Sequence, residues 1–244
     1  MTALQHSIPF ATDPQPRLPG VAPFDPADWL QVDEVYAAQM AERDRLIAAA
    51  PDAVIALAPE ARPAADELLE VVLDHLARDH AERFDVGPDA VRRPDGVTVP
   101  LDRDDPMGTL GRLVQEDLCL MEARGAEHVL TGAVLCFPAS WRLDEKFMRP
   151  LLGIHDPVEV YTEDLARRVQ RLFDGIRPGR PLWRFNALRY ADPALHQPRS
   201  IHDRRPERRD PDSCPYLRSE RQCLVRLPRT QAVVFSIHTY VVKA

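Results

Sequence analysis

The amino-acid sequence predicts an α+β fold in which helices cover an antiparallel sheet. The first third of the chain carries apolar residues at helical spacing. Segments rich in β-forming residues follow at 127–137, 182–190, 222–227 and 232–242. Further helices are predicted between the first and second of these strands. A helical insertion between early and late antiparallel strands is the arrangement that an α+β sheet domain needs.

The chain begins with a proline-rich segment that lacks helical or strand periodicity. Proline fixes φ and removes a backbone donor, so we expect an extended arm over residues 1–26. Residues 27–244 are then predicted to form a single domain with a helical N-terminal part. Asp25 and Pro26 mark the first helix start, because Asp is a favoured N-cap and Pro suits the first helical position.

The next elements are predicted from hydrophobic periodicity. Apolar residues at helical spacing predict helices over 33–50, 63–84 and 110–121. The proline-broken and charged stretch 86–105 predicts a hairpin or an irregular loop. The stretch 127–137 is rich in β-forming residues and lies between a glycine and a proline, which indicates a strand.

The C-terminal half contains both types of element. Helices are predicted over 144–152 and 162–173, followed by a strand over 182–190. Two more strands, 222–227 and 232–242, are joined by a short turn and complete the sheet. Successive side chains of a strand point to opposite faces, so each strand contributes residues to both faces of the sheet.

The composition is that of an ordinary soluble globular protein, and it restricts the function. The 244 residues are 45% hydrophobic and 28% charged, which suits one large domain. The net charge of -7 argues against general nucleic-acid binding, because such proteins need a basic face. The arginine-rich stretch 199–209 is interrupted by acidic residues and is expected to be a solvated loop.

Motifs for several other cofactors and compartments are missing from the sequence. The four cysteines form no CxxC pair, which argues against a structural zinc site and an iron–sulfur cluster. No glycine-rich nucleotide or nicotinamide motif occurs. The sequence shows no membrane-spanning stretch and no signal peptide, so a cytoplasmic protein without membrane or nucleic-acid partners is expected.

His155 is the first candidate for cofactor chemistry. It lies in the segment Gly153-Ile154-His155-Asp156-Pro157-Val158. A neutral imidazole is a strong ligand for metals, haem iron included. Because the following proline ends any helix, the ring is expected at a helix end, where it can point into a pocket. The alternative is a structural histidine that stabilises a helix C-terminus through the helix dipole.

A second candidate set lies on the predicted late strands. In a strand, Arg218, Glu220 and Gln222 share one face, whereas Arg221 points to the other. Large polar groups on a buried face need partners, such as a cofactor carboxylate for arginine or a substrate ammonium for Glu220. An exposed edge with ordinary ion pairs is the alternative.

Other polar side chains allow similar pairs of interpretations. Arg184 and Asn186 share one face of a predicted strand and are either cofactor contacts or members of surface ion pairs. The hydroxyls of Tyr161, Tyr190 and Tyr240 are able to donate hydrogen bonds to a bound ligand. A tyrosine is, however, more often a core residue whose hydroxyl has an ordinary partner.

The order of several sequence blocks resembles the haem-dependent oxidative N-demethylase family. The blocks are Leu113-Val114-Gln115-Glu116-Asp117-Leu118, Phe137-Pro138 with Trp141, the His155 segment with Tyr161, Arg184 with Asn186, Arg218 to Pro228, and Phe235 to Tyr240. The resemblance covers most of the chain from about residue 23. It rests on the joint order and spacing of the blocks and not on any single block.

This resemblance implies a PAS-like haem domain, in which an antiparallel sheet and covering helices hold haem b, with an added N-terminal helical region. It implies that His155 is the axial ligand of the iron. It also implies a monooxygenase that oxidatively removes an N-methyl group from a small methylated amine and releases formaldehyde. Dioxygen is then a co-substrate, and the electrons come from a separate flavin or iron–sulfur reductase.

Roles for the candidate residues follow from these expectations. Catalytic roles are expected for Glu220, Arg221 and Tyr161, and cofactor contacts for His155, Arg184, Asn186 and Arg218. A haem-binding PAS-type gas or redox sensor without turnover is the alternative function, and a domain without any cofactor is a third. The identity of the amine is not implied, because one fold or family serves many substrates.

Overall fold

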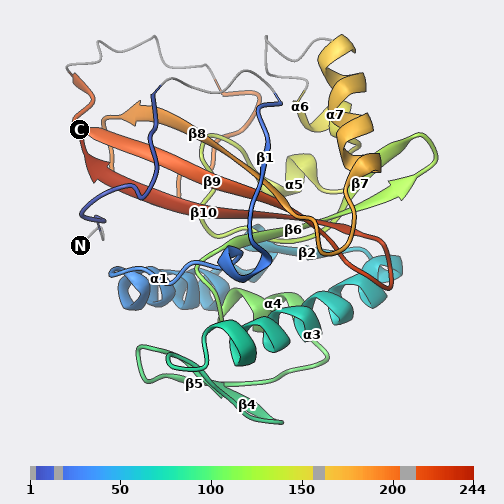
Figure 1. Ribbon diagram of the computed structural model, residues 1–244. Helices are drawn as coiled ribbons and strands as arrows, with labels where there is room; N and C mark the ends of the chain where they lie inside the picture. The colour runs from blue at the N-terminus through green and yellow to red at the C-terminus, as the bar shows by residue number, and fades with distance from the viewer. Residues whose placement is uncertain (1–3, 14–18, 156–162, 204–212) are drawn as a thin grey trace.

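The computed structural model describes residues 4–13, 19–155, 163–203 and 213–244. A central antiparallel sheet has helices on both of its faces (Figure 1). The predicted α+β class is therefore confirmed. The division into an arm over 1–26 and one domain over 27–244 stays a prediction.

The main sheet contains seven strands in the described part of the chain. They are β1 (Ala22–Pro23), β2 (Ile55–Leu57), β6 (Asp117–Arg124), β7 (Glu127–Val134), β8 (Leu182–Tyr190), β9 (Tyr216–Arg226) and β10 (Val233–Lys243). Their order in space is β1-β8-β9-β10-β6-β7-β2, and all neighbours are antiparallel. The strands predicted around 127–137, 182–190, 222–227 and 232–242 are thus confirmed in type and in direction.

Helices from the N-terminal half cover one face of the sheet (Figure 1). They are two 3-10 turns (Pro26–Asp28 and Pro59–Ala61), α1 (Tyr36–Ala49), α2 (Pro51–Val54), α3 (Arg62–Asp79) and α4 (Pro106–Gly111). The Asp25 side chain accepts a hydrogen bond from the backbone N–H of Ala27, which confirms the predicted helix start. The stretch predicted as a hairpin or loop forms a small second sheet of β3 (Asp85–Val86), β4 (Ala90–Arg92) and β5 (Thr98–Pro100).

The other face of the sheet is covered by α5 (Leu143–Lys146), α6 (Leu151–His155) and α7 (Glu163–Gly175). Because strand residues alternate between the faces, the sheet separates two apolar cores. Leu118 and Leu120 pack with the N-terminal helices, whereas Cys119 and Met121 pack on the side of α5, α6 and α7. The sheet therefore lies between two helical layers.

The prediction of a helix over 110–121 is wrong. In the structure α4 ends at Gly111, and the last part of the predicted helix, 117–121, belongs to the strand β6. Residues 117–121 are all buried, because helices cover both faces of the sheet at this strand. A strand that is buried on both faces has no apolar–polar alternation, so its sequence does not differ in pattern from that of a buried helix.

The helix predicted over 144–152 is interrupted in the structure, where α5 and α6 are separate. Between them, Met148 has a φ of 61°, which lies in the left-handed region that ends a helix. The Met148 N–H donates to the Leu130 carbonyl of β7 at 2.8 Å, and Pro150 forms a β-bridge with Val129. Contacts with β7 therefore replace the hydrogen bonds that a continuous helix would have made.

Candidate functional site

A cavity of about 600 Å³ lies between the sheet and helices α5, α6 and α7. Its apolar wall includes Met121, Leu130, Val169, Leu172, Phe235 and Ile237. Met121 and Leu130 lie on the neighbouring strands β6 and β7. Val169 and Leu172 lie on α7, and Phe235 and Ile237 lie on β10. A volume of this size suits a large organic ligand or cofactor.

Polar side chains of β8 and β9 form one end of the cavity. The strand register places Arg184 opposite Gln222 and Asn186 opposite Glu220. Arg184 Nη1 donates to Gln222 Oε1 at 2.6 Å. Asn186 Nδ2 and Gln222 Nε2 both donate to Glu220 Oε2 at 3.0 Å. All four side chains line the cavity, so the alternation predicted for these strands brings them together.

Arg218 lies next to this group and is fixed by backbone carbonyls. Its Nη2 donates to the Phe137 carbonyl at 2.6 Å, and its Nη1 donates to the Leu195 carbonyl at 2.9 Å. The same Nη2 lies 3.8 Å from Glu220 Oε1. The guanidinium of Arg218 is therefore held in one position at the cavity wall, beside the carboxylate of Glu220.

The charges at the cavity wall do not balance. Lys146, Arg184, Arg199 and Arg218 line it together with the acidic Glu220 and Asp203. Burial lowers the pKa of Arg184, against the opposing effect of Glu220, and burial lowers the pKa of Lys146 to about 8. The buried Nε atoms of Arg184 and Arg218 have no hydrogen-bond partner among the described residues. Such surplus donors and positive charge fit a ligand that carries carboxylates.

His155 is the last residue of α6, the helix whose Leu151 and Ile154 line the cavity. The side chain of His155 and the whole of Tyr161 lie outside the residues that the structure describes. Their predicted roles therefore stay predictions. Among the described side chains, no group of three or more His, Cys, Asp or Glu residues is placed to hold a metal ion. A haem iron, by contrast, is held through an axial side chain on a ring that supplies its other ligands.

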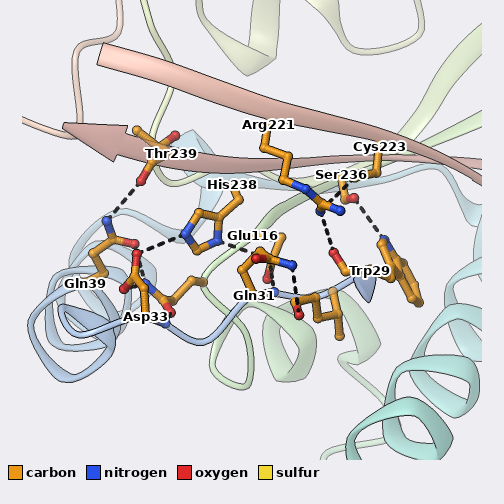
Figure 2. A network of polar contacts seen from close by, with 12 residues as sticks. Trp29, Gln31, Asp33, Gln39, Glu116, Arg221, Cys223, Ser236, His238 and Thr239 are labelled. Carbon is orange, nitrogen blue, oxygen red and sulfur yellow. Dashed lines mark hydrogen bonds and ion pairs between the residues drawn. The ribbon is translucent and has the colours of Figure 1, made fainter. Parts of the chain in front are cut away.

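Arg221 points to the opposite face of the sheet from Glu220. Its Nη1 donates to the Trp29 carbonyl at 2.9 Å, and its Nη2 donates to the Asp28 carbonyl at 2.8 Å (Figure 2). These bonds attach the turn at Pro26–Asp28 to β9. The structure does not bring Arg221 together with Arg218 and Glu220 at the cavity, and no described contact supports its predicted catalytic role.

A buried ionic cluster lies on the face of the sheet opposite the cavity, and it was not predicted from the sequence. His238 lies between Asp33 and Glu116, at 3.2 Å from Asp33 Oδ2 through Nε2 and 3.1 Å from Glu116 Oε1 through Nδ1 (Figure 2). Burial opposes the charged ring, but hydrogen bonds to the two carboxylates and their negative charge outweigh it and raise the pKa of His238 to about 9. The cluster joins the N-terminal region to β10.

The neighbouring Asp117 shows why the segment 113–118 carries so many buried polar groups. Asp117 Oδ1 lies 2.7 Å from Arg43 Nη1, and its carboxylate accepts the backbone N–H groups of Cys136 and Phe137 at 2.7 and 2.9 Å. The Phe137 carbonyl in turn accepts the hydrogen bond from Arg218. These contacts connect α1, on one side of the sheet, to the polar end of the cavity on the other.

The His238 cluster predicts a loss of stability at alkaline pH. The pKa of His238 is raised from 6.5 to about 9 in the folded state, so its stabilising contribution is fully present below pH 6.5 and is lost as the pH rises through about 9. A shift of this size corresponds to at most roughly 3 kcal/mol. Urea unfolding of the wild type and of His238→Gln, measured at pH 6.5 and at pH 9.5, tests this expectation.

The free-energy difference between wild type and His238→Gln should shrink between these two pH values. His6→Gln is the matched control, because the His6 side chain is 89% exposed and should leave the difference unchanged. A difference between wild type and His238→Gln that does not change with pH would contradict a buried imidazolium.

A comparison with protein-family models identifies a relationship over nearly the whole chain. The model described as haem-dependent oxidative N-demethylase, alpha subunit-like, matches residues 20–244. The match includes the N-terminal helices, the strands that line the cavity and every residue of the predicted site. None of the helices that the structure describes combines the length and apolar character needed to cross a membrane.

Proposed function

The chain belongs to the haem-dependent oxidative N-demethylase alpha subunit-like family, and on this premise we propose that it is a haem b monooxygenase acting on a small methylated amine. The proposal includes dioxygen as co-substrate, a separate flavin or iron–sulfur reductase as electron donor, and formaldehyde as product. The observation that carries it is the large cavity with an apolar wall and a cationic end, next to the helix that ends at His155.

The residues of the cavity fit a haem group. Haem b has a large apolar ring, which suits the apolar wall, and two propionates, which suit the cationic end. Arg184 and Arg218, which line the cavity, would hold the propionates through their guanidinium groups. His155, at the end of α6, would bind the haem iron. When bound, haem supplies the activation of dioxygen for oxidation of the N-methyl group.

We also propose that the domain is PAS-like. The helices α5, α6 and α7 are inserted between β7 and β8, and they cover the face of the sheet at which the cavity lies. This arrangement, with a ligand site between an antiparallel sheet and inserted helices, supports the proposal. It also explains why residues from β6 through β10 meet at one site.

Glu220 is the proposed binding group for the substrate ammonium. The hydrogen bonds from Asn186 and Gln222 both reach Oε2, and Oε1 accepts none from the described residues. The oxygen Oε1 lies 3.8 Å from Arg218 Nη2, beyond hydrogen-bond distance, so it is able to accept from an N–H donor in the cavity. A protonated methylamine has such a donor and a positive charge, and a hydrogen bond between charged groups is stronger than one between neutral groups.

Product analysis on haem-loaded protein tests the proposed reaction. The protein is supplied with dioxygen, a flavin or iron–sulfur reductase system, and mono-, di- and trimethylated amines in turn. Formaldehyde and the demethylated amine are expected in equal amounts, with none from haem-free protein. Stable haem binding without formaldehyde from any amine would contradict the proposal and favour a sensor without turnover.

A further inference from the structure

We infer that Lys146 is a positioning residue that fixes the end of α6, and with it the backbone of His155. The inference rests on the proposed function, in which His155 is the haem ligand. Lys146 is the last residue of α5 and lines the cavity. Its Nζ donates to the Ile154 carbonyl at 2.8 Å. The residue after this carbonyl is His155.

The acceptor of this hydrogen bond is one of the last carbonyls of a helix. The final carbonyls of a helix have no partner within the helix, and their partial negative charge favours a cation. The helix α6 has only 5 residues, so it depends on contacts with the rest of the protein for its stability. An ammonium that bonds to its last turn therefore has a large share in fixing that turn.

The start of α6 is fixed by a different set of contacts. The Met148 N–H donates to the Leu130 carbonyl at 2.8 Å, and the Leu130 N–H donates to the Arg149 carbonyl at 3.1 Å. These bonds attach the segment before α6 to β7. With β7 holding one end and Lys146 holding the other, the position of the helix at the cavity wall is determined.

The surroundings of Lys146 favour this role over that of a mobile surface lysine. Its Nζ lies 4.9 Å from the centre of the Trp141 ring, in a cation–π contact. The preceding residue, Glu145, accepts hydrogen bonds from Ser200 Oγ at 2.6 Å and from the Ile201 N–H at 3.0 Å. Adjacent residues of α5 therefore hold two different walls of the cavity, α6 and the segment 199–203.

The test compares Lys146→Met, which keeps the bulk but loses the donor, with Lys146→Arg, which keeps a cationic donor. Haem titration of haem-free protein is expected to show about tenfold weaker binding for Lys146→Met, as for loss of a hydrogen bond to a charged group, with near recovery in Lys146→Arg. The Soret band of Lys146→Met should also be broadened by a mixture of ligation states, and added imidazole should sharpen it. Arg142→Met is the control, because Arg142 is exposed and paired with Asp144 on the same short helix.

Hydrogen exchange provides a second measurement that does not involve haem. In haem-free protein, the amides of residues 151–155 should exchange about tenfold faster in Lys146→Met than in wild type or Lys146→Arg. If Lys146→Met does not fold, Lys146→Leu, which also lacks a donor, takes its place with the same expected changes. Unchanged exchange at 151–155 together with unchanged haem affinity would overturn the inference. Failure of the proposed ligand would appear separately, as a His155→Ala variant with the wild-type spectrum.

Discussion

His155→Ala is expected to abolish the native haem spectrum while the fold survives. The substitution removes an axial imidazole, so the iron loses its bond to the protein. It deletes no large apolar side chain, and the expected cost to the free energy of unfolding is about 1–2 kcal/mol, as for most single substitutions. The measurements are the Soret position and the thermal midpoint on the same variant, with and without added imidazole. Imidazole is expected to restore part of the spectrum.

The structure also defines what a different outcome would mean. His6→Ala is the control, because the His6 side chain is exposed and does not line the cavity. A wild-type Soret band in His155→Ala would mean that another group binds the iron. His128 would be the next histidine to test, because its buried Nε2 has no partner among the described residues and Leu130, two positions later on β7, lines the cavity. Both ring nitrogens of His238 are held by carboxylates.

Glu220→Gln is expected to retain haem and to lose much of its affinity for the amine. The substitution keeps the shape of the side chain and an oxygen acceptor for Asn186, but it removes the negative charge that would bind the substrate ammonium. Loss of a hydrogen bond between charged groups predicts an increase of about 10- to 100-fold in KM for the amine. Steady-state formaldehyde production at equal haem content measures this effect.

Glu42→Gln is the matched control for this prediction. Glu42 lies on α1, where it forms an ion pair with Arg45 at 2.6 Å, outside the cavity. Its substitution should leave both haem content and KM unchanged. A Glu220→Gln variant whose KM equals that of Glu42→Gln would show that the ammonium binds elsewhere, and an early loss of haem would instead assign Glu220 to the cofactor.

Strands whose β-forming residues lie between turn-forming residues were predictable from the sequence. The strand Leu182–Tyr190 has the predicted bounds, because β-forming residues lie there between turn signals. The strand predicted from 222 begins at Tyr216 instead. Its polar residues pair with Arg184 and Asn186 across the sheet, and such pairing depends on strand register, which a single segment does not reveal.

Part of the candidate site followed from alternation alone. Arg218 and Glu220 share a strand face, as do Arg184 and Asn186, and all of them line one cavity. The role of Lys146 was not predictable, because it depends on the break at Met148 that turns α6 back toward α5.

The cluster of Asp33, Glu116 and His238 could not be predicted from the sequence, for a different reason. Its members are far apart in the chain and meet only when the N-terminal region packs behind β10. No local pattern of charge or hydrophobicity marks such a contact. The segment Gln115-Glu116-Asp117 was part of the family resemblance, and its buried polar contacts show that it has a structural role.

The most direct test of the central claim is the haem content of the purified protein. Protein produced with an adequate supply of haem is measured by its absorption spectrum and by the pyridine haemochrome assay. The account predicts a Soret band and one non-covalently bound haem b per chain, consistent with the absence of a C-x-x-C-H motif from the sequence. Protein that shows no Soret band and takes up no stoichiometric haem on reconstitution would contradict it.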